Sequence, residues 1–462
     1  MNKIIAFVTL IILFPSYVFS FLPFKNDKSF EIFGNGYSDG FISVNGETAT
    51  VTVTENAEDS CVSYDFGGYK TDWFNYFGIK YRTDAYMSGE ITYTVKEQLH
   101  SEKFYLEPSE SETDFYSFID DFLENRKAYR LNKITFTALD KESAEFDLLG
   151  IGLFNRKVPC RNVFIQTDEY KLGVDLNWGG ALSYLEDLNS NVQAVKKDGR
   201  IFVDSDASKR YKARSINNSV NLINRYDPGR LVQQSYYGTT GENGEFGEFI
   251  GYEWRYNPVQ GGNKYGESAK LIDVIADGNE LYIKCRPLDW AMPAENYSPS
   301  YMEARYSIDG NIVNVSCRFV DFSGNASAVA EQEMPAFYCI EPFNRFVYST
   351  IDESLKYENE LGFWADNGEE AYFKSSQNWA AFTGEFDDSF GIGIYVPQCL
   401  KFKAGVFNRE QTSEKDPSKD SATSYIAAIN VIEFASYKPI EYSFSMTTGT
   451  AEQIQETFGK IN

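Results

Sequence analysis

The chain has 462 residues, a formal net charge of −24 and a single histidine. This acidic excess disfavours partners that are recognised through basic patches, so the sequence predicts no binding to nucleic acid or to anionic membranes. One imidazole, His100, excludes metal sites built from several histidines, and no G-x-S-x-G nucleophile elbow accompanies it. Catalysis by this chain would therefore depend on carboxylate, tyrosine, arginine or lysine side chains.

The N-terminal residues have the features of a cleaved export signal. Lys3 gives a positive start, an apolar run extends from Ile4 to Phe14, and Val18 and Ser20 occupy the small-residue positions of a cleavage site. The run is shorter than the roughly 20 apolar residues that a spanning helix needs. We therefore expect residues 1–20 to be removed, the mature protein to be secreted, and no membrane span to remain.

Alternation of apolar and polar residues, which is typical of strands with one buried face, recurs along the mature chain. The clearest examples are Ala49 to Thr54, Ile91 to Val95, Ile312 to Val320, Phe390 to Val396 and Tyr442 to Met446. Helical spacing is rare: it occurs from Asp114 to Leu123, and Thr450 to Gln453 has the pattern of a capping box that opens a last helix. The sequence predicts an all-β protein with few short helices.

The cysteines and acidic loops bear on disulfides and metals. All six cysteines lie in the mature part, where an exported chain can form disulfides, and Cys285 with Cys317 is the first choice because both fall in neighbouring strand-like segments. No metal is expected in the active site and no cofactor is expected. A structural calcium ion has candidate oxygen ligands at Asp39, Asp204 to Asp206, Asp387 and Asp388.

A polar, proline-containing joint near residues 156–163 divides the chain into two predicted modules, Asp27 to Lys157 and Val163 to Asn462. In the first, the segments Phe77 to Thr83, Ile134 to Phe136 and Phe146 to Gly152 resemble the jelly-roll carbohydrate-binding modules of secreted glycan-degrading enzymes. That resemblance implies a β-sandwich that stacks sugars on exposed aromatic rings. Candidate rings, which would serve equally well as core, are Trp73, Phe74, Tyr76 and Tyr86.

The larger module contains a strand that turns through paired glycines, Leu176 to Leu185, and a second motif from Asn221 to Tyr237. With these segments it resembles the galactose-mutarotase-like β supersandwich used by several polysaccharide lyases, glycoside hydrolases and sugar epimerases. The resemblance implies a large two-sheet fold with a carbohydrate site. Mutarotases of this fold work with histidines, and this module has none, so mutarotase activity is disfavoured.

Side chains suited to sugar recognition are densest between Arg225 and Gly266. Planar amide and guanidinium groups pair with hydroxyls, indoles stack on sugar rings, and the glycine-rich loop that follows allows close approach. The substrate-binding candidates are Arg230, Gln233, Trp254, Asn257, Gln260 and Lys264.

Two catalytic chemistries remain open at this stage. Hydrolysis of a glycosidic bond needs one protonated and one ionised carboxyl group; Glu333, beside Met334 and Pro335, suits the first role, and Glu253 or Asp227 suits the second. A lyase would instead use a tyrosine or lysine to remove a proton, for which Tyr265 is the candidate.

The function predicted from the sequence is that of a secreted carbohydrate-active protein whose partner is an oligo- or polysaccharide. Its activity is expected to be that of a glycoside hydrolase or polysaccharide lyase acting on extracellular glycan. The alternative is a glycan-binding or surface protein without turnover.

Overall fold

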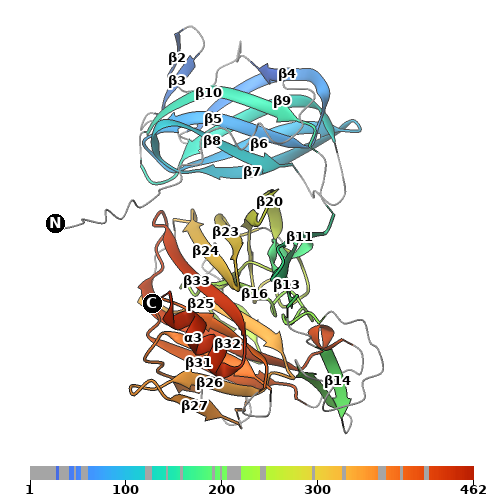
Figure 1. Cartoon of the computed structure of the whole chain (residues 1–462). Coiled ribbons are helices and arrows are strands. Elements are labelled where there is room, and N and C mark those ends of the chain that lie inside the picture. The colour runs from blue at the N-terminus through green and yellow to red at the C-terminus, as the bar shows by residue number, and fades with distance from the viewer. Residues whose placement is uncertain are drawn as a thin grey trace, which may run out of the picture.

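The computed structural model describes residues 28–30, 41–45, 48–53, 61–119, 127–141, 144–156, 160–189, 193–197, 200–204, 220–239, 246–293, 297–324, 329–359, 361–362, 371–384, 389–409 and 416–461. Strands account for nearly all elements in these ranges, which confirms the all-β prediction. Two β-built bodies are stacked on each other, with the N-terminal strands in one and the C-terminal strands in the other (Figure 1). The predicted export signal lies outside the described residues.

The N-terminal body has two antiparallel sheets. One contains β2 (Phe41–Asn45), β3 (Thr48–Val53), β10 (Ala144–Phe154), β5 (Tyr76–Thr83) and β8 (Ser109–Phe118), with β1 (Lys28–Phe30) paired to β10. The other contains β4 (Cys61–Phe74), β9 (Ala128–Ala138), β6 (Met87–Val95) and β7 (Gln98–Leu106). Alternate residues of β6 are buried, as the period of a strand requires. The core between the sheets is rich in aromatic rings, among them Phe77, Phe104 and Phe136.

The helix predicted from Asp114 to Leu123 is wrong. Residues up to Phe118 belong to β8, where Phe115 pairs with Ile79 and Phe118 with Tyr76 of β5. The spacing of the phenylalanines matches a helix, but pairing with a neighbouring strand satisfies the backbone groups and buries the same rings, so tertiary context overrides the local pattern. Residues 120–126 lie outside the described part of the chain.

The C-terminal body has two larger sheets. The ten-stranded sheet runs through β11 (Asn162–Gln166), β12 (Tyr170–Asp175), β13 (Ala181–Asp187), β16 (Val232–Ser235), β25 (Val329–Ile340), β32 (Thr423–Glu433), β31 (Lys401–Phe407) and β28 (Tyr372–Phe373), with β19 (Pro258–Val259) on β16 and β22 (Leu288–Asp289) on β19. The nine-stranded sheet runs through β20 (Lys270–Asp277), β21 (Glu280–Arg286), β23 (Ser300–Asp309), β24 (Ile312–Asp321), β33 (Ile440–Gly449), β30 (Gly391–Tyr395), β29 (Trp379–Thr383), β26 (Arg345–Ser349) and β27 (Leu355–Glu358).

Smaller elements complete this body. They are the hairpins β14 (Gln193–Lys197) with β15 (Arg200–Asp204) and β17 (Gly247–Phe249) with β18 (Tyr252–Trp254), the 3-10 turns η3 (Leu176–Trp178) and η4 (Pro417–Lys419), and the helix α3 (Ala451–Gly459). The predicted capping box is confirmed: the Thr450 side chain accepts from Gln453 N, and the Gln453 side chain accepts from Thr450 N. Within the described ranges no helix is long and apolar enough to cross a membrane.

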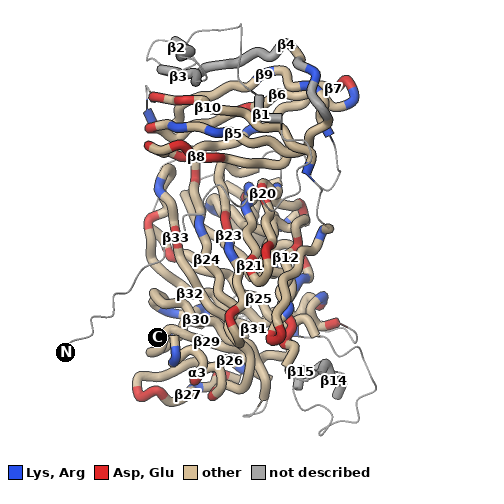
Figure 2. Tube along the Cα trace, turned by 45° about the horizontal axis from the view of Figure 1, so that its top comes forward, with Lys and Arg blue, Asp and Glu red and all other residues tan. Residues whose placement is uncertain are grey.

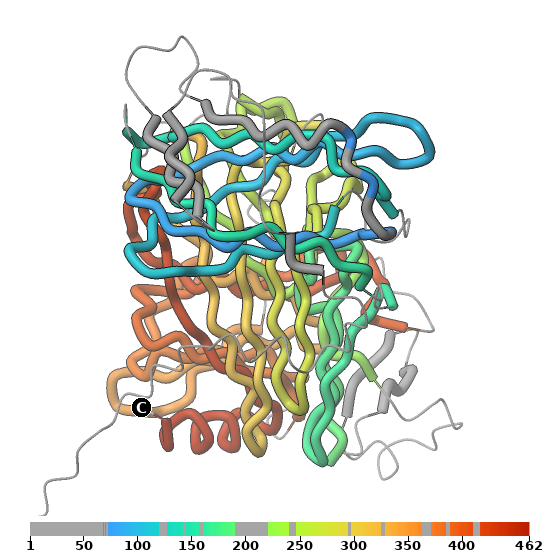
Figure 3. Tube along the Cα trace, turned by 90° about the horizontal axis from the view of Figure 1, so that it is seen from above, coloured from blue at the N-terminus to red at the C-terminus, as the bar shows by residue number. Residues whose placement is uncertain are grey.

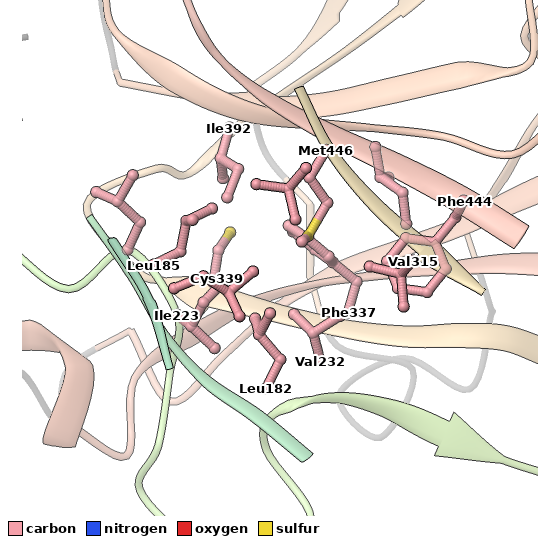
Figure 4. Close-up of a cluster of buried hydrophobic side chains, with 14 of the residues drawn as sticks. Leu182, Leu185, Ile223, Val232, Val315, Phe337, Cys339, Ile392, Phe444 and Met446 are labelled. Carbon is pink, nitrogen blue, oxygen red and sulfur yellow. The ribbon is translucent and has the colours of Figure 1, made fainter. Parts of the chain in front are cut away.

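The main core lies between the two large sheets (Figure 4). Val232, Phe337 and Cys339 point into it from the ten-stranded sheet, while Val315 and Met446 point into it from the nine-stranded sheet. Because successive side chains of a strand alternate between faces, Ala336 and Tyr338 on β25 face away from this core. That outer face of the ten-stranded sheet carries the polar and aromatic residues described below.

The predicted bridge between Cys285 and Cys317 is not formed. Both cysteines are buried free thiols, as is Cys339, and Cys160 and Cys399 are also unpaired. Strand β23 lies between β21 and β24, so a whole strand separates Cys285 from Cys317. The side chain of Cys61 is not among those that the structure describes.

The two bodies meet through a buried interface. Seen along the stacking direction, the N-terminal strands lie in front of the C-terminal body (Figure 3). Arg156, just after β10, forms an ion pair with Asp273 of β20 at 2.5 Å, and both side chains are less than one tenth exposed. Tyr301 and Phe322 of the C-terminal body pack into the N-terminal core, and the Tyr301 hydroxyl accepts from Tyr105 N at 2.8 Å. The contact combines apolar packing with desolvated charges.

Candidate functional site

The outer face of the ten-stranded sheet carries a cluster of tyrosines on β25 and β32. Tyr425 packs with Ala336 and Ala427, and Tyr338 and Phe407 lie against this group. The ring centroids of Tyr338 and Tyr425 are 4.6 Å apart. The small alanine side chains on the adjacent strands leave room for the tyrosine rings to lie over the sheet. We call this group of rings, Tyr338 and Tyr425 with Phe407, the tyrosine platform.

Glu333 is the acidic centre of this platform. It lies on β25, where it pairs with Ser235 of β16 on one side and Ile429 of β32 on the other, and it is only 8% exposed. Tyr237 and Tyr425 both interact with its carboxylate through side-chain hydrogen bonds. Burial, followed by the negative charge of Glu333, raises the pKa of both tyrosines well above the usual value. These hydroxyls therefore remain protonated and donate to the carboxylate.

Asp227 supplies a second carboxyl group in the same neighbourhood. Its Oδ1 accepts from Gly229 N at 2.9 Å, and its Oδ2 lies 3.4 Å from Nε of Arg230. Burial raises the pKa of Asp227, and the opposing charge of Arg230 offsets only part of that effect. The charges of Glu333, Arg230 and Asp227 all act on Tyr338, in that order of strength. Both acids are thus close enough to Tyr338 for their charges to act on its pKa.

A row of aromatic side chains borders these acids. Ring centroids are 6.4 Å apart for Tyr237 and Trp254 and 5.3 Å apart for Trp254 and Trp290. The indole nitrogen of Trp290 would lie 3.3 Å from a Cβ at Gly229, so Trp290 reaches the Asp227 turn and a side chain at Gly229 would crowd it. Arg255 is exposed, and its guanidinium lies 5.4 Å from the ring centroid of Tyr237. Indole and tyrosine faces beside acids form a suitable surface for a sugar ring.

The amide residues predicted to bind substrate are buried and already hydrogen-bonded within the protein. Gln233 accepts from Gly261 N at 2.7 Å and donates to Pro228 O at 3.0 Å. Asn257 donates to Tyr236 O at 2.7 Å and accepts from the Trp254 indole at 3.3 Å.

Gln260 is also hydrogen-bonded within the protein: it accepts from Gln234 N at 3.3 Å and donates to Gly179 O at 3.3 Å. These three amides hold the loops and the indole in place, and their polar atoms are occupied without a ligand.

Glu253 lies on β18 of the β17–β18 hairpin, and Lys264 and Tyr265 lie in the loop between β19 and β20. Glu253 is exposed and faces away from its neighbour Trp254, because the two are consecutive on β18. Lys264 donates to Glu248 O, and Tyr265 is 54% exposed. Among the described residues, no hydrogen bond or ion pair joins any of these three side chains to Glu333.

Several residues of the platform were missed by sequence reasoning. Tyr338 and Tyr425 come from β25 and β32, and Tyr237 follows β16, so the three are distant in sequence. Trp290 follows the short strand β22, which the alternation pattern does not reveal. The sequence of β32 did carry a signal for the platform. Tyr425 and the small residue Ala427 are two positions apart and therefore lie on the same face of the strand. The histidine is not part of the site: His100 stacks on Tyr93 in the N-terminal body at 5.7 Å.

Asp289 is a further titratable residue that the sequence did not single out. Its Oδ1 accepts from Asn257 N at 3.2 Å, and burial raises its pKa to about 6. Because the pKa of an unfolded aspartate is about 3.9, the folded state binds this proton more tightly, and stability falls as the pH rises from about 4 to about 6. We expect Asp289→Asn to raise the free energy of unfolding at pH 7 by about 1–3 kcal/mol, since an amide carries no charge to desolvate.

Urea unfolding at pH 4 and pH 7 measures this effect, with the exposed Asp277→Asn as the matched control. The gain should be confined to pH 7, where Asp289 is ionised. An equal gain at both pH values would mean that charge burial is not its cause.

No group of three or more His, Cys, Asp or Glu side chains capable of holding a metal ion occurs among the described residues. Of the predicted calcium ligands, Asp39, Asp206, Asp387 and Asp388 lie outside them, and Asp204 ends β15 without a described side chain. Calcium binding by these residues stays a prediction.

Comparisons with known proteins find no matching family model and no matching curated protein sequence. Solved structures with similar arrangements include a galactose mutarotase related enzyme from Lactobacillus acidophilus, at 9% identity, covering 63% of this chain and 97% of that one with a TM-score of 0.36. A GH36 α-galactosidase from Geobacillus stearothermophilus is 10% identical, over 63% of this chain and 40% of that chain, with a TM-score of 0.32.

A family 29 carbohydrate-binding module is 12% identical over 30% of this chain and 95% of that chain, with a TM-score of 0.21. All three TM-scores lie below 0.5, so any function for this chain has to be argued from its own residues.

Proposed function

We propose that the chain is an exported carbohydrate-active enzyme that hydrolyses glycosidic bonds on the outer face of the ten-stranded sheet. The observation that carries this proposal is that Glu333 and Asp227 both lie close to Tyr338, beside a row of half-buried aromatic rings. Hydrolysis of a glycosidic bond needs two carboxyl groups, one that donates a proton and one that acts as base or nucleophile.

The two acids suit opposite roles, and these roles are the reverse of those suggested by their sequence neighbours. Asp227 has a raised pKa and would protonate the oxygen of the leaving sugar. Glu333 accepts hydrogen bonds from Tyr237 and Tyr425, which hold its carboxyl group in a fixed position on the sheet. As the carboxylate it would take a proton from water as the water oxygen bonds to the anomeric carbon, or would itself attack that carbon before water completes the hydrolysis.

The same geometry favours hydrolysis over elimination. A lyase needs a base that removes a carbon-bound proton, yet Tyr237, Tyr338 and Tyr425 all have pKa values raised by burial and by Glu333. At neutral pH these hydroxyls are donors and not bases. Tyr265 and Lys264, the sequence candidates for the lyase reaction, lie in the loop between β19 and β20, and the Lys264 side chain donates to Glu248 O.

A panel of extracellular glycans incubated with the purified mature protein tests the proposal. We expect new reducing ends without the ultraviolet absorbance of unsaturated uronates. Reducing ends together with that absorbance would instead establish a lyase. Glycan binding without either signal would establish the alternative, a capture protein without turnover.

Activity should also fall on the alkaline side as the pH rises through the raised pKa of Asp227, because the deprotonated carboxyl has no proton to donate. Asp227→Asn should lower kcat by about 10²- to 10⁴-fold on substrates with poor leaving groups and should abolish this alkaline limb. Aryl glycosides that leave without protonation separate the roles: their cleavage should be much less affected. An unchanged pH profile in Asp227→Asn would assign the acid to another residue.

A further inference from the structure

The N-terminal body has an open groove of about 540 Å³, far in sequence from the acids of the proposed active site. It is lined by Lys70, Trp73, Lys96, Glu97 and Tyr129. Trp73 lies next to the end of β4 and Tyr129 next to the start of β9, so adjacent strands of the four-stranded sheet form its floor. The turn between β6 and β7 forms its rim.

Trp73 is the residue that needs an explanation. Its indole is 53% exposed, whereas the other aromatic candidates of this module, Phe74, Tyr76 and Tyr86, are buried in cores. Trp73 and Tyr129 have ring centroids 5.1 Å apart and planes inclined by 57°, which gives two faces meeting at an angle. Arg130 lies against Tyr129, with its guanidinium 5.5 Å from the ring centroid. The exposed indole and the neighbouring tyrosine thus offer two faces on which a sugar ring can stack.

The groove is locally basic in a strongly acidic chain. Among the described side chains, Lys70, Lys96 and Glu97 are the charged residues that line the groove, and Arg130 lies against Tyr129, while the whole chain has a formal net charge of −24. Acidic and basic positions occur together at the β7 end of this body (Figure 2). The cores of protein interfaces are depleted in lysine and glutamate, so charges placed directly beside the indole disfavour a protein partner.

The rim residues are held in an unfavourable backbone conformation. Lys96 and Glu97 have φ angles of 46° and 69°, the left-handed region in which a two-residue hairpin turn prefers Asn and Gly. The chain thus retains two long charged side chains at positions where the backbone disfavours them, and both line the groove. This cost is explained if the side chains are needed there.

We infer that this groove is a second carbohydrate site, which binds a polysaccharide carrying carboxylate groups. The sugar ring lies against Trp73 and Tyr129, Lys70 and Lys96 pair with carboxylates of the ligand, and Glu97 accepts from hydroxyls. A volume of this size falls in the range of small-molecule sites, so it accommodates a short stretch of the polymer. The site extends the proposed carbohydrate activity to a second location and does not use its acids.

The decisive variant replaces the rim turn itself. Lys96→Asn with Glu97→Gly removes the two charged side chains and installs the preferred turn residues, so we expect the melting temperature to rise while binding is lost. Trp73→Ala should weaken binding by about tenfold or more, as expected for a central indole. Leu99→Ala and Lys133→Gln, exposed positions of the same body, are the matched controls and should bind as the unaltered chain does.

Affinity electrophoresis of the full mature chain, in a Glu333→Gln background that prevents turnover, gives the readout. The probes are two matched pairs, polygalacturonate with its methyl ester and carboxymethyl cellulose with hydroxyethyl cellulose. We expect the carboxylated polymer of at least one pair to retard the protein and its neutral counterpart not to retard it. High salt should weaken the binding to the carboxylated polymer.

Equal retention by charged and neutral polymers would overturn the carboxylate preference. Absence of binding to all four polymers, or binding that survives the rim and Trp73 variants, would overturn the site. Because the measurement is of binding alone, a failure of the proposed hydrolysis leaves it readable, and the two failures are distinguishable.

Discussion

Glu333→Gln should reduce kcat by about 10³-fold or more while leaving the affinity for the glycan substrate nearly unchanged. The amide has the same shape and still accepts hydrogen bonds from Tyr237 and Tyr425, but it can neither take a proton from water nor attack the anomeric carbon. Initial rates over a range of glycan concentrations give kcat and KM, and thermal unfolding checks that the variant is folded.

The matched control is Glu253→Gln, an acid that sequence reasoning placed in the same catalytic role. Its side chain is exposed at the β17–β18 hairpin, so kcat should change by less than about twofold. Comparable losses in the two variants, or full activity in Glu333→Gln, would rule out Glu333 as the catalytic carboxylate.

Arg156→Ala should lower the free energy of unfolding by about 3–5 kcal/mol, the largest effect on stability that we expect from a single substitution. The guanidinium pairs with Asp273 at 2.5 Å, donates to Val274 O and lies 4.8 Å from the ring centroid of Tyr76. Its removal leaves the Asp273 carboxylate buried at the interface without its cation. Urea unfolding followed by tryptophan fluorescence and by far-ultraviolet circular dichroism measures the change.

Two comparisons separate charge burial from lost packing. Replacing both partners with apolar residues, Arg156→Met with Asp273→Leu, should cost much less than the single substitution, because no charge is then left unpaired. Lys80→Ala breaks the exposed pair with Glu112 and should cost at most about 1 kcal/mol. A loss below about 1 kcal/mol in Arg156→Ala would mean that water reaches Asp273 and that the interface is not closed as described.

The strand pattern was the most reliable part of the sequence reading. Alternation from Ile312 to Val320 predicted the buried face of β24, because side chains of a strand alternate by geometry alone. The capping box at Thr450 was equally predictable, since its hydrogen bonds join residues three apart. The helix predicted from Asp114 shows the limit of such patterns, because pairing with β5, a distant segment, makes this stretch a strand instead.

The candidate site was only partly predictable. Glu333, Asp227, Arg230 and Trp254 were identified from their residue types and neighbours, and the structure places all of them at or beside the tyrosine platform. The amides Gln233, Asn257 and Gln260 are also of a type suited to sugar binding, but their polar atoms form hydrogen bonds within the protein. Sequence alone does not distinguish an amide side chain that is free to bind a ligand from one whose hydrogen bonds stabilise a loop.

By itself, then, the sequence determined the β character of the chain, the faces of its clearest strands and the helix that begins after Thr450, because these depend on interactions between near neighbours. Only the tertiary structure decided that β16, β25 and β32 lie side by side, which brings Tyr237 and Tyr425 to Glu333. It also decided that Trp73 is exposed while Tyr76 is buried. Strand order and burial depend on pairing between segments far apart in the chain, and local residue patterns do not specify that pairing.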